Sequence, residues 1–137
     1  NKISKKIHKQ RVFSLANTFK SAMVDVTSTD LTTVVTVPTA DPGATPPVPP
    51  TTAIVKSILI CNDSGSTTLV DVEVVRSSAT FEIFKAFSIT TNTTKDPLAE
   101  LGSTLVLQES DVLKVQANAA NQVHVTVSFM EVTKGQL

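Results

Sequence analysis

The chain has 137 residues, of which 41% are hydrophobic, and its 12 basic and 12 acidic residues give a formal net charge of zero. This length and composition exclude a disordered chain and allow one domain with a hydrophobic core. No apolar run approaches the roughly 18–20 residues of a membrane-spanning helix, so we expect no membrane partner. Thr and Val are abundant while Trp and Tyr are absent, which favours an all-β fold.

Residues 1–20 are predicted to form a basic N-terminal arm. Residues 1–24 carry six basic residues and no acid, whereas residues 25–137 carry six basic and twelve acidic residues. A charge of +6 therefore precedes an acidic body of charge −6. The apolar positions of the arm fit no regular helix, so we expect it to be extended or partly helical. Its candidate partner-binding residues are Lys2, Lys5, Lys6, Lys9, Arg11, Phe13 and Phe19.

Three partners are open to this arm. The favoured partner is an acidic surface of another protein, and the second is the acidic body of the same chain. Nucleic acid is the least favoured, because only phosphate neutralisation supports it. The basic cluster of residues 5–11 contains no aromatic side chain, so stacking on bases is not predicted.

From Ser21 the apolar residues recur with a period of two, which predicts a β-sandwich domain over residues 21–137. In the clearest segment Val123, Val125 and Val127 point one way and His124 points the other. The predicted strands cover residues 22–27, 31–38, 52–61, 67–75, 80–89, 104–108, 111–117 and 122–132. About eight short strands at this spacing indicate an antiparallel β-sandwich, jelly-roll-like in type.

A proline-rich excursion at residues 38–50 interrupts the strands and holds six of the seven prolines. Proline cannot donate a ladder hydrogen bond, and the run from residue 46 to 50 favours stiff, extended polyproline II. The excursion is therefore either a long crossover between sheets or a segment that reaches a neighbouring subunit. Its candidate partner-binding residues are Pro46, Pro47, Pro49 and Pro50.

Two segments of the sequence are expected to contribute apolar residues to the core. The stretch AIVKSILIC, residues 53–61, is apolar on both faces, which predicts a strand covered on both sides or one at a subunit contact. Cys61 in this stretch is expected to be a small buried hydrophobe. Phe81, Ile83, Phe87 and Ile89 share one parity and are expected to supply much of the core. Truncating a buried Phe81 to Ala would then cost about 3–5 kcal/mol.

No catalytic, cofactor-binding or metal site is predicted. The chain has no glycine-rich phosphate loop and no cluster of His and Cys. Cys61 and His124 could pair as nucleophile and base, but two single residues are too little to predict catalysis. We therefore expect no enzyme and no cofactor. The acids in or beside loops are expected to be solvated, namely Asp63, Asp71, Asp96, Glu100, Glu109 and Asp111.

The segment from Thr51 to Val132 resembles small β-sandwich virion proteins of tailed bacteriophages. The residues that carry the resemblance are TTAIVKSILICNDSGSTTLVDVEVV and, later, LVLQESDVLKVQANAANQVHVTVSFMEV. In this pattern a strand ending in Asn62 precedes a hairpin of Ser and Gly. A unit from Leu107 to Ala117 then precedes a final alternating strand. Ser110 stands where the family often has glycine.

The resemblance implies a structural component of the virion, of the capsid-decoration, neck or tail-accessory type, without an active site. We expect its partners to be other virion proteins and further copies of itself, bound through the arm and the loops, which the resemblance does not cover. The alternative is a receptor- or glycan-binding β-sandwich module. The absence of Trp and Tyr disfavours that alternative, because sugar-binding sandwiches commonly stack sugars on aromatic side chains.

Overall fold

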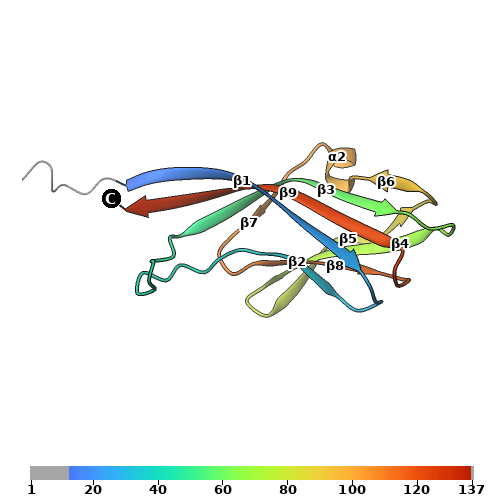
Figure 1. Ribbon diagram of the computed structural model, residues 1–137, viewed down its shortest axis with the longest axis horizontal. Helices are drawn as coiled ribbons and strands as arrows, with labels where there is room; N and C mark the ends of the chain where they lie inside the picture. Colours follow the sequence, from blue (N-terminus) through green and yellow to red (C-terminus); the bar gives the residue numbers. More distant parts are fainter. Residues whose placement is uncertain (1–12, 137) are drawn as a thin grey trace, which may run out of the picture.

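The computed structural model describes residues 13–136, and the burial of side chains over residues 16–134. Two antiparallel sheets pack face to face (Figure 1), which confirms the predicted β-sandwich. In the five-stranded sheet, β1 (Phe13–Val26) pairs with β9 (Val123–Gln136), and β9 pairs with β3 (Thr51–Asn62). The short strands β6 (Thr93–Lys95) and β7 (Leu105–Leu107) pair with the two ends of β3.

The four-stranded sheet has the order β2-β8-β4-β5. Its strands are β2 (Thr32–Thr36), β8 (Val112–Ala117), β4 (Thr68–Arg76) and β5 (Ala79–Ile89). Within the described residues, the helical segment is α2 (Pro97–Leu101). Within residues 13–136 no helix has the length and hydrophobicity that a membrane crossing requires.

The core lies between the sheets and consists mainly of alternating valines, as the period of two predicted. Val123, Val125 and Val127 of β9 are buried, and so are Val70 and Val72 of β4. Successive side chains of a strand point to opposite faces, so each sheet buries every second residue. His124 lies on the exposed face of β9, as expected.

Strand β3 contains a bulge that explains its two apolar faces. The register with β9 shifts between Val55 and Ser57, so the extra residue Lys56 reverses the alternation. Val55 and Ile58 both face the core although their parities differ. Part of the two-sided apolar pattern is therefore a change of phase, and the remainder lies on the outer face.

Strand β1 begins at Phe13, inside the segment predicted as an extended or partly helical arm. It pairs with β9 in an unbroken register from Phe13 opposite Gln136 to Val26 opposite Val123. We call residues 13–20 of β1 with residues 129–136 of β9 the projecting ribbon, because this end reaches beyond the four-stranded sheet (Figure 1). Residues 13–20 are thus extended, which is one of the two forms expected for this segment. Whether residues 1–20 act as an arm stays a prediction.

The segment between the predicted strands at residues 80–89 and 104–108 contains α2. The Asp96 carboxylate accepts hydrogen bonds from the N–H groups of Leu98 at 3.0 Å and Ala99 at 3.3 Å, which caps the helix. Pro97 follows in the first turn, and Gly102 ends the helix at φ 62°. These are ordinary start and stop signals, but five residues are too few to show a helical period.

The prediction that Phe81 lies in the core is wrong. Phe81 is 54% exposed, Ile83 and Phe87 are half-buried, and Ile89 is buried. The pairing of β4 with β5 shifts register twice, and Ala86 has φ 50°, so parity does not persist along the strand. Phe81 also lies on an edge strand. The expected cost of Phe81→Ala therefore falls well below the figure for a buried phenylalanine.

The proline-rich excursion is compact rather than extended. Asp41 and Val48 exchange two backbone hydrogen bonds of 2.9 Å each, which close the loop between them. The Thr45–Pro46 peptide bond in this loop is cis. The excursion leads from β2 in one sheet to β3 in the other, so it is a crossover. Whether it also reaches a neighbour stays a prediction.

Candidate assembly surface

An apolar row crosses the outer face of the five-stranded sheet. Phe19 of β1 lies opposite Met130 of β9, Met130 lies opposite Ile54 of β3, and Ile54 lies opposite Val106 of β7. Residues directly opposite each other in a sheet share a face, so these four side chains form one line across four strands. Phe19 is 78% exposed and Val106 is 51% exposed. We call these four residues the apolar row.

A second line of side chains runs parallel to the apolar row. Met23, which is 74% exposed, and Leu59 lie on either side of Thr126. Between the two lines Ser21, Ser128 and Ser57 form a row of small polar side chains in the same way. The outer face is therefore apolar over much of its width, which is typical of an interaction surface.

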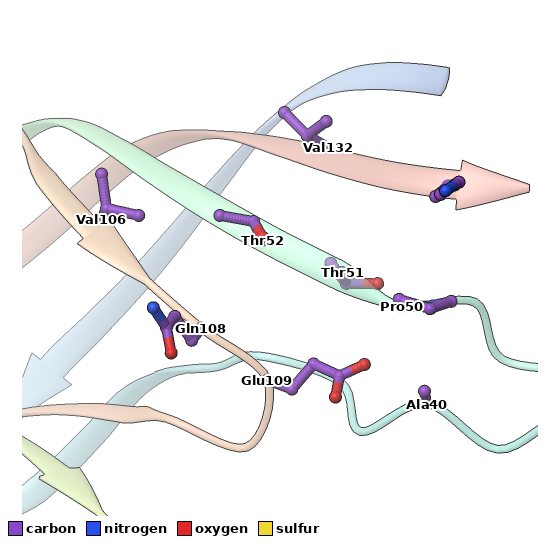
Figure 2. A pocket seen from close by; sticks show the side chains of 9 residues that line it. Ala40, Pro50, Thr51, Thr52, Val106, Gln108, Glu109 and Val132 are labelled. Atoms are coloured by element: carbon purple, nitrogen blue, oxygen red, sulfur yellow. The ribbon is translucent and has the colours of Figure 1, made fainter. Parts of the chain in front are cut away.

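A groove opens beside the apolar row (Figure 2). It has a volume of about 720 Å³ and is lined by Ala40, Pro50, Thr51, Thr52, Val106, Gln108, Glu109, Val132 and Lys134. Val106, Thr52 and Val132 come from β7, β3 and β9, while Ala40 and Glu109 come from the loops at its rim (Figure 2). The groove therefore joins the outer face to the proline-rich excursion.

The structure places the predicted partner-binding residues unevenly. Lys2, Lys5, Lys6, Lys9 and Arg11 lie outside the described residues. Phe13 begins β1 and pairs with Gln136, and Phe19 lies in the apolar row.

The four prolines divide between the excursion and the groove. Pro46 and Pro47 are exposed within the loop that the Asp41–Val48 bridge closes, and Pro49 is half-buried. Pro50 lines the groove, and its carbonyl accepts a hydrogen bond from the Lys134 N–H at 3.2 Å. Phe19 and Pro50 are therefore brought to the same end of the five-stranded sheet.

Sequence reasoning missed most of the outer face. Ile54 and Leu59 were signalled by the apolar residues on both faces of residues 53–61, and Met130 by its break in the alternation of β9. Met23 and Val106 carried no comparable signal. A line of apolar residues on four strands appears only when the registers are known, since the residues are far apart in the chain.

Cys61 and His124 are directly opposite each other on the outer face. His124 Nε2 lies 3.1 Å from Asp63 Oδ2, and Nδ1 lies 3.6 Å from Asp25 Oδ1. Both ring nitrogens are thus directed at carboxylates, so neither is set to take a proton from the Cys61 thiol. Cys61 itself is half-buried, not buried as predicted.

Within the described part of the chain, no group of three or more His, Cys, Asp or Glu side chains is placed to hold a metal ion. The cluster around His124 is a surface arrangement of one imidazole between the carboxylates of Asp25 and Asp63. When His124 is protonated, each neighbouring carboxylate can form a charge-assisted contact with it.

Asp111 is not the solvated turn acid that was expected, because its side chain is only 1% exposed. Arg76 Nε donates to Oδ1 at 2.8 Å and Nη2 donates to Oδ2 at 2.6 Å. The Gln108 N–H donates to Oδ2 at 2.7 Å. The hydrogen bonds from Arg76 lower the pKa of Asp111, although burial opposes them. Asp111 therefore fastens the turn before β8 to β4.

Asp71 was expected to be solvated but is half-buried, and Glu73 lies two residues further along the same strand. Burial alone would raise the pKa of Asp71, but the hydrogen bonds from Lys85 at 2.8 Å and the Ala86 N–H at 2.7 Å lower it overall. Glu73 is buried, and burial followed by the charge of Glu82 raises its pKa. Asp63, Glu100 and Glu109 are exposed, as expected.

No protein-family model and no curated protein matches the chain. Among solved structures, the chain is similar to the acid-stable capsid structure of Helicobacter pylori bacteriophage KHP30, with 14% identity and a TM-score of 0.42. That alignment covers 93% of this chain and 97% of the other.

The chain is also similar to the structure of infectious bursal disease virus, Gt strain, with 9% identity and a TM-score of 0.41. It covers 91% of this chain but only 33% of the viral chain, so the protein spans about a third of that length. Neither likeness is close enough to transfer a function. We therefore take the function from the protein's own surfaces.

Proposed function

We propose that the chain is a structural component of a tailed-phage virion, a capsid decoration protein or a neck or tail accessory protein. It binds neighbouring subunits through the outer face of the five-stranded sheet. The observation that carries this proposal is the apolar row of Phe19, Met130, Ile54 and Val106. The resemblance of the sequence to phage virion proteins supports a phage virion as the assembly that contains the chain.

The composition of this face fits a subunit contact. Burial of apolar surface contributes about 25 cal/mol per Å², and a stable interface buries on the order of 1,600 Å² in total. The apolar row provides an apolar centre, and the groove residues Glu109 and Lys134 provide polar groups at its edge. An apolar centre within a polar rim is the usual anatomy of an interface.

Further contacts are assigned to the arm and the excursion. Residues 1–12 bring five basic residues and no acid, which suits an acidic surface on a neighbouring virion protein or on another copy. The excursion offers Pro46 and Pro47 on an exposed, closed loop. We also propose that the sandwich is a jelly roll, because its first and last strands are neighbours and the chain passes repeatedly between the sheets.

The test replaces one residue of the apolar row by a charged residue. Val106 is exposed, so the Val106→Asp protein should fold. A carboxylate that is desolvated in the contact should lower the occupancy of this variant in particles at least about tenfold. Leu69→Asp, on β4 of the other sheet, is the matched control and should enter particles normally. Occupancy is measured by quantitative mass spectrometry of purified virions, and folding by circular dichroism.

Normal occupancy of a folded Val106→Asp protein would remove the outer face as the contact. Specific, competable binding of the wild-type protein on a glycan array, together with its absence from purified virions, would favour a receptor-binding module instead.

A further inference from the structure

Strand β1 is an edge strand without the usual protection. An open edge presents unpaired N–H and C=O groups to any other strand, and proteins normally blunt such edges with short strands, prolines, bulges or lysines. β1 has 14 residues, its register with β9 is unbroken, and it contains no proline. Its one lysine, Lys20, is engaged by Glu131 at 3.0 Å.

The other edge strands of the described sheets are all protected. β6 and β7 have three residues each. β2 has five residues and a register shift against β8. β5 has two register shifts against β4 and a residue, Ala86, at φ 50°. β1 therefore stands apart as a long, regular strand whose free edge is ready for a partner.

We propose that β1 pairs antiparallel with β1 of a second copy, about a two-fold axis at Ser21, so that one sheet runs through both subunits. The inference rests on the proposed assembly role and names the partner as a copy of the same chain. Residues 16–21 are exposed along the strand, and Phe19 and Met23 are the most exposed apolar side chains of the outer face. Pairing would cover both.

The side chains of β1 select the register. Residues opposite each other must share a face, so Phe19 can oppose Met23 but not Ala22. A pair centred on Ser21 places Phe19 opposite Met23 of the second copy, and does so twice. A pair centred on Lys20 would set the two lysines against each other, and one centred on Ala22 would set Phe19 against Asp25. The Ser21 register avoids both conflicts.

Charge also favours the antiparallel arrangement. It brings the start of each β1 to the end of the other, where Asp25 lies beside the Asp63–His124 pair and Asp30 follows in the next turn. Residues 1–12, with five basic side chains and no acid, lead into the start of β1. The sequence therefore places five basic residues immediately before the strand end that lies beside the acidic end of the other copy. Exposed charges are screened beyond about 8 Å at physiological salt, so high salt should weaken the dimer.

Disulfide trapping tests the register. On a Cys61→Ser background, Phe19→Cys with Met23→Cys should give a covalent dimer under mild oxidation, because residues directly opposite each other in a sheet lie within reach of a disulfide. Phe19→Cys alone should stay monomeric on a denaturing gel. In the proposed register its two thiols lie four residues apart along the strand, about 13 Å. Cross-linking by the single variant, or none by the double variant, would overturn the register.

Sedimentation velocity on the full chain tests the pairing itself. The wild-type protein should be a dimer, and Phe19→Lys should raise the dimer dissociation constant at least about tenfold. Phe81→Lys is the control, because Phe81 is an exposed phenylalanine on an edge strand of the other sheet, and this variant should remain dimeric. A monomeric wild-type protein, or equal weakening by both substitutions, would refute the inference.

The same experiments keep this inference apart from the proposed function. Val106→Asp lies at the opposite end of the apolar row from β1, so it should remain dimeric in solution while failing to enter particles. A dimer that depends on Phe19, with normal particle occupancy of Val106→Asp, would support the β1 pairing and count against the outer face as the particle contact.

Discussion

At the scale of single residues, the buried carboxylate of Asp111 shows how a loop position becomes structural. It accepts three hydrogen bonds, two from Arg76 and one from the Gln108 N–H. Its own N–H donates to the Gln108 carbonyl at 3.1 Å, and its carbonyl accepts from the Val37 N–H at 2.9 Å. One residue therefore links β4, the segment after β2 and the turn before β8.

Asp111→Asn should lower the free energy of unfolding by about 1–3 kcal/mol at pH 7, because the charged acceptor of Arg76 is lost. The Arg76 hydrogen bonds lower the folded pKa of Asp111 below its ordinary value of 3.8. A lowered folded pKa means that this stabilisation is complete above pH 3.8 and disappears as the pH falls through the folded pKa. Urea unfolding at pH 7, 5 and 3 should thus show the two proteins converging only at the lowest pH. The exposed neighbour variant Glu109→Gln should change little, and a wild-type to Asp111→Asn gap that is constant with pH would contradict this account.

Phe81 shows why the burial of a single residue could not be predicted from its parity in the sequence. Its parity with Ile89 suggested a shared inner face, yet Ile89 is buried and Phe81 is 54% exposed. The intervening bulge is set by backbone geometry at Ala86 and by the pairing with β4. The pattern of apolar residues in a sequence does not reveal such a register shift, because an apolar residue is compatible with the alternation before and after the shift.

At the scale of elements, the turn from β3 to β4 is built around the buried side chain of Asn62. Its Nδ2 donates to the carbonyls of Ser66 at 2.7 Å and Ile89 at 2.9 Å. Its Oδ1 accepts from the N–H of Ser64 at 3.0 Å and from the Ser64 hydroxyl at 2.7 Å. The turn is thereby tied to β5 in the other sheet. Because β3 and β4 lie in different sheets, this Ser- and Gly-rich turn connects the two sheets and is not the hairpin that the sequence predicted.

Asn62→Asp is expected to reduce stability by at least about 3 kcal/mol, since a buried carboxylate would face two carbonyl oxygens and lose both donors. Asn118→Asp is a matched control. Asn118 Oδ1 accepts from the Leu69 N–H at 3.0 Å, an acceptor that aspartate retains, so its cost should stay below about 1 kcal/mol. Thermal and urea unfolding of both variants measure these losses of stability. Similar losses in the two variants would show that the hydrogen bonds donated by Asn62 are unimportant.

At the scale of the whole molecule, both faces of the five-stranded sheet carry apolar side chains. Its inner face packs on the four-stranded sheet with Val125, Val127, Ile58 and Ile60. Its outer face carries the apolar row, and its β1 edge is long and open. The four-stranded sheet offers a more polar exterior with the Asp71–Lys85 ion pair. We therefore propose that contacts with other subunits are made through this sheet.

Deletion of residues 1–12 should leave the thermal midpoint unchanged but lower particle occupancy, because it removes five positive charges and no residue of β1. Deletion of residues 1–20 removes strand residues that pair with residues 129–136 of β9, so it should also lower the midpoint by several degrees. Differential scanning calorimetry and virion mass spectrometry measure the two effects. Full occupancy after the shorter deletion would show that the basic segment makes no contact in the particle.

The sequence alone determined the class of fold and most of the strands. Alternation of Val with polar residues in β4, β8 and β9 is a local property, since each residue's face follows from its neighbours in the chain. The long strand at residues 52–61, the turn position after Asn62 and the final strand were therefore predicted with boundaries close to those observed. The predicted hairpin at that turn was wrong, because β3 and β4 lie in different sheets. The asymmetry of charge between residues 1–24 and the body also required no structure.

Only the tertiary structure decided which surfaces are free. The apolar row joins residues of β1, β9, β3 and β7, which are separated by up to about a hundred positions in the chain, so it exists only once the registers are set. The bulges at Lys56 and Ala86 and the burial of Asp111 by Arg76 likewise depend on what lies opposite in space. Periodicity reports the face of a residue within its own strand, whereas contact and exposure depend on the neighbours that folding supplies.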